Sequence, residues 1–186
     1  MKITLINPPY SLQERYGEKI PKDLQYTLPP LGLMYIAASL EKYNHEVSII
    51  DVPAYNYTIQ EIIEKIKQQN PEIIGITALT PTINNTLKLS KEIKQNFPNT
   101  LIVLGGAHPS GFPQKILEEN EFIDIIVIGE GELTFPELCD KIEKKRSLSL
   151  VKGIAYTYKN KIIINPKREY IKNLDEIPFP ARHLVP

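Results

Sequence analysis

The sequence predicts an α/β protein in which helices cover both faces of a parallel β-sheet. Short apolar runs alternate along the chain with longer segments whose apolar residues recur at helical spacing. Five of these runs carry apolar residues at consecutive positions, so both faces of each strand should be buried. The chain has 186 residues, of which 42% are hydrophobic, and this is enough for one domain with a sizeable core and a small appendage.

The first half of the chain should form three strands and two helices. Pro29 and Pro30 favour the start of a helix whose apolar face continues to Leu40. Thr58 and Glu61 have the spacing of a capping box, which predicts that the second helix starts at Thr58. The strands are expected at 3–6, 47–50 and 72–77.

The second half should continue this alternation and then depart from it. Pro81 fits the first turn of a helix that runs to about Phe97, and the pair Thr134 and Glu137 predicts a capping box at the start of the last helix. Beyond that helix the apolar period falls to two at 154–158, and after a turn at 159–161 an apolar run returns at 162–164, which predicts a β-hairpin. Further strands are expected at 101–104 and 123–128, and a short helix at 113–120.

Five strand–helix units favour a flavodoxin-like parallel sheet of strand order 2-1-3-4-5 with helices on both faces, to which the C-terminal β-hairpin is added. Ligands of such sheets bind at the carboxyl ends of the strands, near the switch between strands one and three. We expect a ligand-binding domain at 1–148, the hairpin appendage at 149–170 and a proline-rich linker at 171–186.

The composition argues against several classes of binding partner and of cellular setting. The 22 basic and 22 acidic residues balance, so no net field favours nucleic acid or an anionic membrane. A single cysteine, Cys139, excludes a disulfide or a cysteine-held metal cluster within this chain and fits a reducing, cytoplasmic setting. The apolar run at the N-terminus is too short for a signal peptide, and no stretch is long enough to span a bilayer.

Four strand ends carry the candidate chemistry. Their small side chains would let a bulky ligand approach the backbone, and a helix N-terminus favours phosphate. The glycines could equally well do no more than end the strands, and composition leaves both interpretations open. The segments are Asn7-Pro8-Pro9, Thr77-Ala78-Leu79-Thr80, Gly105-Gly106-Ala107-His108 and Gly129-Glu130-Gly131-Glu132.

Several common sites are excluded by their missing residues. The sequence has no G-x-G-x-x-G after the first strand and no P-loop motif. A phosphoacceptor receiver domain would need acidic residues where Asn7 and Thr77 stand. No serine- or cysteine-based catalytic arrangement is evident, so we expect no catalytic residue in this chain.

Taken in order, these motifs resemble the cobalamin-binding N-terminal domain of cobalamin-dependent radical S-adenosylmethionine proteins. The resemblance also includes the segment from Leu28 to Leu33, Asp51 after the second strand, and the closing segment 174–180, which is similar to the lead into that family's catalytic domain. It covers nearly the whole chain, and the order and spacing of the motifs make it specific.

The resemblance implies a role for each loop. The Gly105-Gly106 pair would make room for the benzimidazole of the cofactor's nucleotide tail, Thr77 and Leu79 would line the channel for that tail, and the loop around Glu130 would lie on its other side. The implied cofactor-binding residues are Asn7, Pro8, Pro9, Tyr10, Thr77, Ala78, Leu79, Thr80, Gly105, Gly106, His108, Gly129, Glu130 and Gly131.

Two departures from the family pattern limit what is implied. Where related cobalamin domains carry a cobalt-ligating histidine after strand one, this chain has Asn7-Pro8-Pro9-Tyr10, so cobalamin would bind base-off without a histidine ligand. The family's three-cysteine motif is absent, so S-adenosylmethionine and a 4Fe-4S cluster would belong to a radical domain in cis that is missing from this chain.

The full-length protein is therefore expected to perform methyl transfer or related carbon-centred chemistry, and the fragment alone none. Two alternatives remain: a flavodoxin-like domain that binds a flavin or another nucleotide, and a docking module without a cofactor.

Single residues have competing interpretations. His108 is expected to contact the corrin amides rather than cobalt, and His45 and His183 to lie on the surface or in the linker. Glu130 and Glu132 fit the start of a helix better than an acid–base pair or metal ligands. Three tyrosines of the first loop would either cover a corrin face or pack on the sheet edge: Tyr10, Tyr16 and Tyr26.

Overall fold

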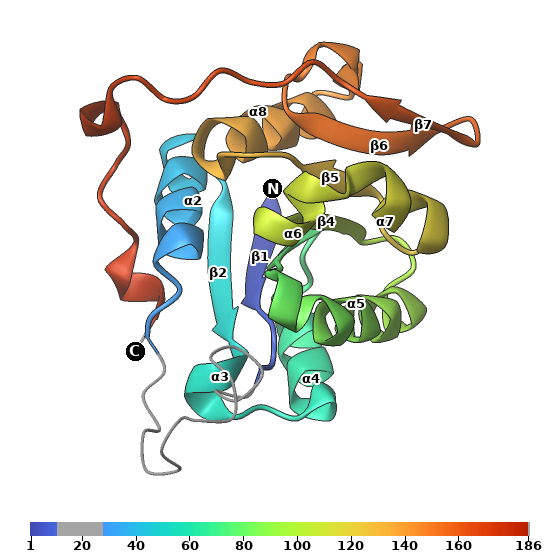
Figure 1. Cartoon of the computed structure of the whole chain (residues 1–186). Helices are drawn as coiled ribbons and strands as arrows, with labels where there is room; N and C mark the ends of the chain where they lie inside the picture. The colour runs from blue at the N-terminus through green and yellow to red at the C-terminus, as the bar shows by residue number, and fades with distance from the viewer. Residues whose placement is uncertain (11–27, 186) are drawn as a thin grey trace.

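One seven-stranded sheet runs through the computed structural model, which describes residues 1–10 and 28–185 (Figure 1). Its order is β2-β1-β3-β4-β5-β6-β7, with parallel pairing from β2 to β5 and antiparallel pairing from β5 to β7. The expected flavodoxin-like order 2-1-3-4-5 is thereby confirmed. The strands are β1 (Lys2–Asn7), β2 (Glu46–Asp51), β3 (Ile73–Thr77), β4 (Leu101–Gly105), β5 (Ile125–Val127), β6 (Ile154–Tyr158) and β7 (Lys161–Ile164).

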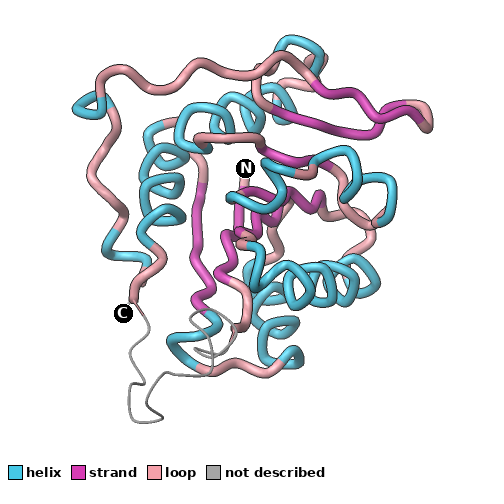
Figure 2. Tube along the Cα trace, in the orientation of Figure 1, coloured by secondary structure: helices cyan, strands magenta, loops and turns pink. Residues whose placement is uncertain are grey.

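Helices cover both faces of the sheet (Figure 2). Because successive strand residues point to opposite faces, Ile73 packs into one apolar cluster with α2 (Leu31–Lys42) and α8 (Gly131–Glu143). Its neighbour Ile74 packs into the other cluster, with α4 (Ile59–Gln69), α5 (Ile83–Asn96) and α7 (Pro113–Glu119). Apolar burial on both faces explains why the parallel strands carry continuous apolar runs.

The capping box expected at Thr58 is confirmed. The backbone N–H of Glu61 donates to Thr58 Oγ1 at 3.3 Å, and the N–H of Thr58 donates to Glu61 Oε2 at 2.8 Å. The second capping box, expected at Thr134, is wrong, because α8 already begins at Gly131. Thr134 lies fully buried inside that helix, where its hydroxyl accepts a hydrogen bond from Arg168 Nε at 2.8 Å.

Two short helices at strand ends were not expected. These are α3 (Val52–Tyr55) after β2 and α6 (Ala107–Gly111) after β4. Each is too short to show helical periodicity, and α6 carries a glycine and a proline, which normally indicate a loop. Both lie beside the carboxyl edge of the sheet, where they set the path of the connecting chain.

The hairpin extends the sheet instead of standing apart from it. Strand β6 pairs with β5 through Ile154, Ala155 and Tyr156. Lys159 and Asn160 form the two-residue turn, and both have positive φ angles, of 49° and 60°, as a type I′ hairpin turn requires. The boundary placed between residues 148 and 149 remains a prediction.

The chain after the hairpin, which we call the C-terminal strap (residues 166–185), is packed on the two helices of one face. Figure 1 shows it passing α8 and then running beside α2. Ala181, only 3% exposed, donates its N–H to the carbonyl of Met34 at 3.0 Å. His183 lies on the surface as expected, with Nε2 2.8 Å from Glu41 Oε1. The expected linker is aperiodic, but it is held in place.

His45 corrects another expectation, because it is buried and only 6% exposed. Burial and the nearby N-terminal ammonium group lower its pKa. Cys139 is also fully buried, and burial raises the pKa of its thiol. Within residues 1–10 and 28–185, no cluster of histidine, cysteine and acidic side chains is suited to hold a metal ion. None of the helices described here has the length and apolar character needed to cross a bilayer.

Candidate functional site

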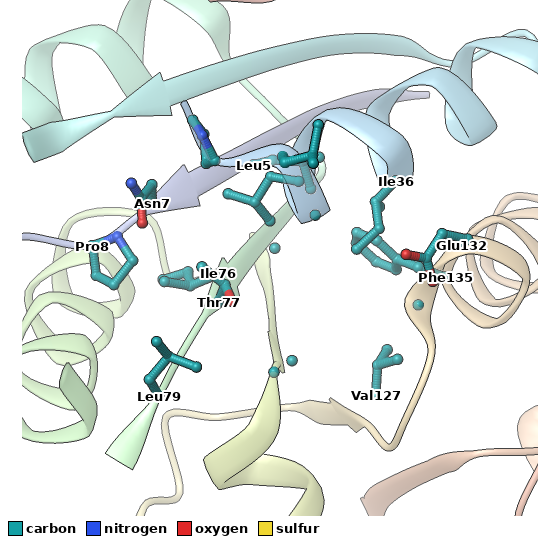
Figure 3. Close-up of a pocket in the computed structure, with 18 of the residues that line it drawn as sticks. Leu5, Asn7, Pro8, Ile36, Ile76, Thr77, Leu79, Val127, Glu132 and Phe135 are labelled. Atoms are coloured by element: carbon teal, nitrogen blue, oxygen red, sulfur yellow. The ribbon is translucent and has the colours of Figure 1, made fainter. Parts of the chain in front are cut away.

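A cavity of about 620 Å³ opens at the carboxyl ends of β1, β3, β4 and β5, on the face covered by α2 and α8 (Figure 3). Asn7 and Pro8 lie at one end of it, while Ile36 and Phe135 lie at the other. Its volume is within the range of pockets that hold small molecules and cofactors. The position agrees with the rule that open α/β sheets bind ligands beyond the carboxyl ends of their strands.

The floor of the cavity is formed by the sheet itself. Leu5, Gly75 and Val103 are neighbours in register across β1, β3 and β4. A Cβ atom on Gly75 would lie 2.8 Å from Leu5 Cδ2 and 2.9 Å from Phe135 Cε1. The glycine therefore lets Phe135 lie directly on the sheet, where its ring closes the deep end of the cavity.

Nearer the strand ends, at Gly105, no side chain covers the floor of the cavity. It pairs with Thr77 on β3, and a Cβ built on Gly105 would find only Val127 Cβ, 4.0 Å away. Its φ is not in the left-handed region, so neither backbone conformation nor neighbouring atoms require a glycine there. The missing side chain leaves space in the cavity rather than room for another part of the protein.

Gly106 has a different role, because its backbone requires a glycine. Its φ is 101° and its ψ is −177°, and a Cβ atom would lie 2.6 Å from the carbonyl oxygen of Ala78. The close approach lets Ala78 donate its N–H to the carbonyl of Gly105 at 2.8 Å and accept from His108 N–H at 3.3 Å. Gly106 thus fastens the end of β4 to the loop after β3.

Ser110 joins the two glycine loops. Its hydroxyl donates to the carbonyl of Gly106 at 2.8 Å and accepts from the N–H of Gly129 at 2.9 Å. Gly129 has a φ of 81°, and a Cβ on Gly131 would lie 2.8 Å from Ile36 Cδ1. The loop after β5 therefore turns sharply at Gly129 and brings α8 close to α2 at Gly131.

Asn7 is a buried polar group at the switch between β1 and β3. It is 8% exposed, and its Nδ2 donates to Asp51 Oδ1 at 2.8 Å. Burial raises the pKa of Asp51, while the hydrogen bonds from Asn7 and from the backbone of Ala54 act in the opposite direction. The bond fixes the Asn7 side chain at the end of the cavity.

The polar groups that line the cavity are mostly neutral. Of the described residues that line it, Glu130 and Glu132 are the only charged ones. The N-terminus of α2 lies at the cavity with Leu31 and Gly32 in the lining, and no side chain caps it. Its first turn carries no acidic residue, so the helix dipole there is not compensated by a carboxylate.

Most of the residues expected from sequence come together in this cavity. Its lining includes Asn7, Pro8, Tyr10, Thr77, Leu79, Gly105, Gly106, Gly129, Glu130 and Gly131. Four expected residues do not line it: Pro9, Ala78, Thr80 and His108. His108 instead places Nδ1 3.2 Å from Thr80 Oγ1 and packs its ring against Phe112. Tyr16 and Tyr26 lie outside the described residues.

Other lining residues were not in the expected cofactor-binding set, although Glu132 and the segment from Leu28 to Leu33 had been noted as motifs. Those on the sheet face look like ordinary core, and Tyr170 lies in what was expected to be a linker. One signal was present: Gly75 interrupts an apolar strand, which often marks a close approach or a ligand. The lining residues outside the expected set are Leu5, Leu28, Pro29, Pro30, Leu31, Gly32, Leu33, Ile36, Gly75, Ile76, Thr82, Val103, Val127, Glu132, Phe135 and Tyr170.

Comparison with known protein families gives a match over most of this domain. The family model described as the B12 binding domain matches residues 21–139. This range contains the strand ends after β3, β4 and β5 together with the N-terminus of α2.

Two longer proteins are similar in sequence to the chain. It is 39% identical over 186 residues to an uncharacterised methyltransferase of Pyrococcus horikoshii, covering all of this chain and 39% of that protein. It is 33% identical over 177 residues to the anaerobic magnesium-protoporphyrin IX monomethyl ester cyclase of Synechocystis, covering 94% of this chain and 34% of the cyclase. The chain thus spans little more than a third of the length of these relatives.

The fold is also found in a solved structure. The cobalamin-dependent S-adenosylmethionine radical enzyme OxsB, with aqua-cobalamin and S-adenosylmethionine bound, superimposes with a TM-score of 0.79 at 23% identity. The match covers 96% of this chain and 24% of OxsB.

Proposed function

The chain belongs to the B12-binding domain family, and from this premise we propose that its cavity takes the nucleotide tail of cobalamin while the corrin ring lies over the strand ends. The single observation that supports this assignment best is the bare floor at Gly105, where a side chain could be accommodated and none is present. A flat benzimidazole base needs a slot of that kind between the sheet and its covering helices.

The residues present fit such a tail. The cavity is deep and apolar at Leu5, Val103 and Phe135, which suits an aromatic base. Nearer its mouth, Thr77 and the N-terminus of α2 supply neutral hydrogen-bond donors for the polar part of the tail. Burying the base in this cavity would remove it from the lower face of the corrin.

The proposed cofactor-binding set follows from the lining. It keeps the expected residues that lie in the cavity and adds Gly75, Val103 and Phe135 on its floor and deep wall. Pro9 O accepts a hydrogen bond from Asn85 Nδ2 at 3.2 Å, so Pro9 would shape the strand-one loop rather than contact the cofactor. His108, bonded to Thr80, would remain beside the tail and away from cobalt.

For the full-length protein we propose methyl transfer or a related carbon-centred reaction with a radical S-adenosylmethionine domain in cis. When bound, cobalamin supplies a cobalt centre for such chemistry, and S-adenosylmethionine and a 4Fe-4S cluster would belong to the second domain. Names of the relatives support this proposal, since they include a methyltransferase and a cobalamin-dependent radical enzyme. A cytoplasmic location remains a prediction from the single cysteine.

Equilibrium dialysis of the purified chain against hydroxocobalamin tests the proposed function. We expect about one equivalent of cofactor per chain, with a shift in its visible spectrum, because the cavity at the strand ends has the size to hold the tail of one cofactor molecule. Flavin mononucleotide serves as the matched competitor, since flavodoxin-like sheets also bind flavins at this edge. Retention of flavin mononucleotide without uptake of cobalamin would contradict the proposal.

A further inference from the structure

Tyr170 is an exposed aromatic residue at the mouth of the cavity, although it belongs to the C-terminal strap and not to the sheet or its helices. It lines the cavity and is 67% exposed. The ring therefore presents a large apolar surface to whatever occupies the cavity mouth. An aromatic ring in this position gains most when another flat or apolar surface covers it.

The strap is fastened to α8 on both sides of this tyrosine. The N–H of Ile171 donates to Glu130 Oε2 at 2.8 Å. On the other side, Arg168 forms an ion pair with Glu137 and donates through Nε to Thr134 Oγ1. Of these three partners, Glu130 immediately precedes α8, while Thr134 and Glu137 lie within it, and α8 also lines the cavity.

Gly153 makes room for the strap to pack closely against the domain at Arg168. Gly153 has a φ of 75°, and a Cβ atom on it would lie 3.3 Å from Arg168 Cβ and 3.2 Å from the carbonyl oxygen of Ile128. The glycine lets Arg168 pass close over the backbone. The far end of the strap is held on α2, where the N–H of Ala181 donates to Met34 O.

From this arrangement we infer that Tyr170 is a cofactor-contacting residue, which the strap delivers to the cavity mouth and Glu130 positions through Ile171. The inference rests on the proposed function, since it assigns Tyr170 to the bound cobalamin. Glu130 acts as a positioning residue: its carboxylate accepts from the strap backbone and holds the adjacent tyrosine at the rim.

Occupancy of the cavity and docking of the strap are then coupled. A cofactor that contacts Tyr170 binds more tightly when the strap is docked, and by linkage the bound cofactor holds the strap in place by the same factor. The coupling gives two independent measurements, one on cofactor affinity and one on the strap.

The first measurement is the dissociation constant for hydroxocobalamin. We expect Tyr170→Ala to weaken binding about tenfold and Tyr170→Phe to stay within about threefold, because the ring makes the contact. Tyr158→Ala is the matched control. Tyr158 is 55% exposed and has Lys159 Nζ 5.3 Å from its ring centroid, as Tyr170 has Lys167 Nζ at 5.2 Å, but it lies on β6 away from the cavity. Its replacement should leave affinity unchanged.

The second measurement is limited digestion by trypsin with and without hydroxocobalamin. Cleavage after Lys167 and Lys172, in the strap, should slow at least about fivefold when the cofactor is bound. Cleavage after Lys159, in the hairpin turn, and after Lys161, the first residue of β7, should not change, and these sites serve as the internal control. In Tyr170→Ala the protection of the strap should be lost.

The outcomes separate this inference from the proposed function. If the unchanged chain takes up cobalamin, but Tyr170→Ala binds it equally well and the strap is not protected, the inference is wrong and the proposed function stands. An equal loss in Tyr158→Ala would also overturn the inference, because the effect would not arise at the cavity. If the unchanged chain takes up no cobalamin, the proposed function is wrong and the inference with it.

Discussion

Replacing Gly105 with valine is expected to weaken cobalamin binding about tenfold to hundredfold and to leave the fold intact. The valine side chain would project into the cavity from the bare part of its floor, where the cofactor's base is proposed to lie. Overpacking of such a site costs on the order of 1–3 kcal/mol. The free energy of unfolding should change by less than about 1 kcal/mol, because Gly105 has no positive φ and only Val127 Cβ lies near the new side chain.

Equilibrium dialysis and thermal melting of the same preparation measure the two effects separately. Gly105→Ala gives a graded control, since its single methyl group should weaken binding less than valine does. Normal cobalamin binding by the folded valine variant would show that the base lies elsewhere.

Replacing the next residue, Gly106, with alanine should give the opposite result: a loss of stability of about 3 kcal/mol or more. The φ of 101° is costly for any residue with a side chain, and the new Cβ would press against the backbone of Ala78 at 2.6 Å and Thr77 Oγ1 at 3.0 Å. These contacts are with backbone and a strand residue, which cannot move aside cheaply.

Urea unfolding of Gly106→Ala beside Gly105→Ala measures this difference between neighbouring glycines. The alanine at 105 is the matched control, because it makes the same chemical change one residue away without strain. Equal stability of the two variants would contradict the strained role of Gly106. The sequence predicts one shared role for the Gly105-Gly106 pair, whereas the structure divides it into an open slot and a backbone requirement.

Much of the fold could be predicted because local signals and tertiary packing agree. The capping box at Thr58 and the continuous apolar strands point to the same α/β order that the structure shows. The signal failed at Thr134, where the pattern of a capping box is present but the helix begins at Gly131. There tertiary contacts determine where the helix begins. Gly131 allows α8 to approach Ile36, and the Thr134 hydroxyl accepts a hydrogen bond from Arg168 of the strap instead of capping the helix.

The candidate site was predictable at the strand ends and not on the sheet face. Loop residues such as Asn7 and Gly129 stand out because small or unusual residues end strands there. Leu5 and Val103 cannot be told from core residues by their sequence, because only the separation of α2 and α8 from the sheet exposes them to a cavity. The position of Tyr170 at the cavity could not be predicted for another reason: it depends on the tertiary contacts of an aperiodic segment.

The state of the cobalt in bound cobalamin tests the central claim most directly, because a base buried in the sheet cannot also bind beneath the corrin. The strand-one loop offers Asn7, Pro8 and Tyr10 at the cavity, and none of them supplies an imidazole. The residues of this loop that would hold the cofactor would therefore supply no nitrogen ligand in place of the buried base.

Electron paramagnetic resonance of the protein loaded with cobalamin and reduced to cobalt(II) measures this state. The account predicts cobalt lines without splitting by a coordinated nitrogen. Splitting by one strongly coupled nitrogen would contradict it. His108→Ala would then identify the donor: splitting that disappears would assign the nitrogen to His108, and splitting that persists would indicate that the benzimidazole is still attached to cobalt.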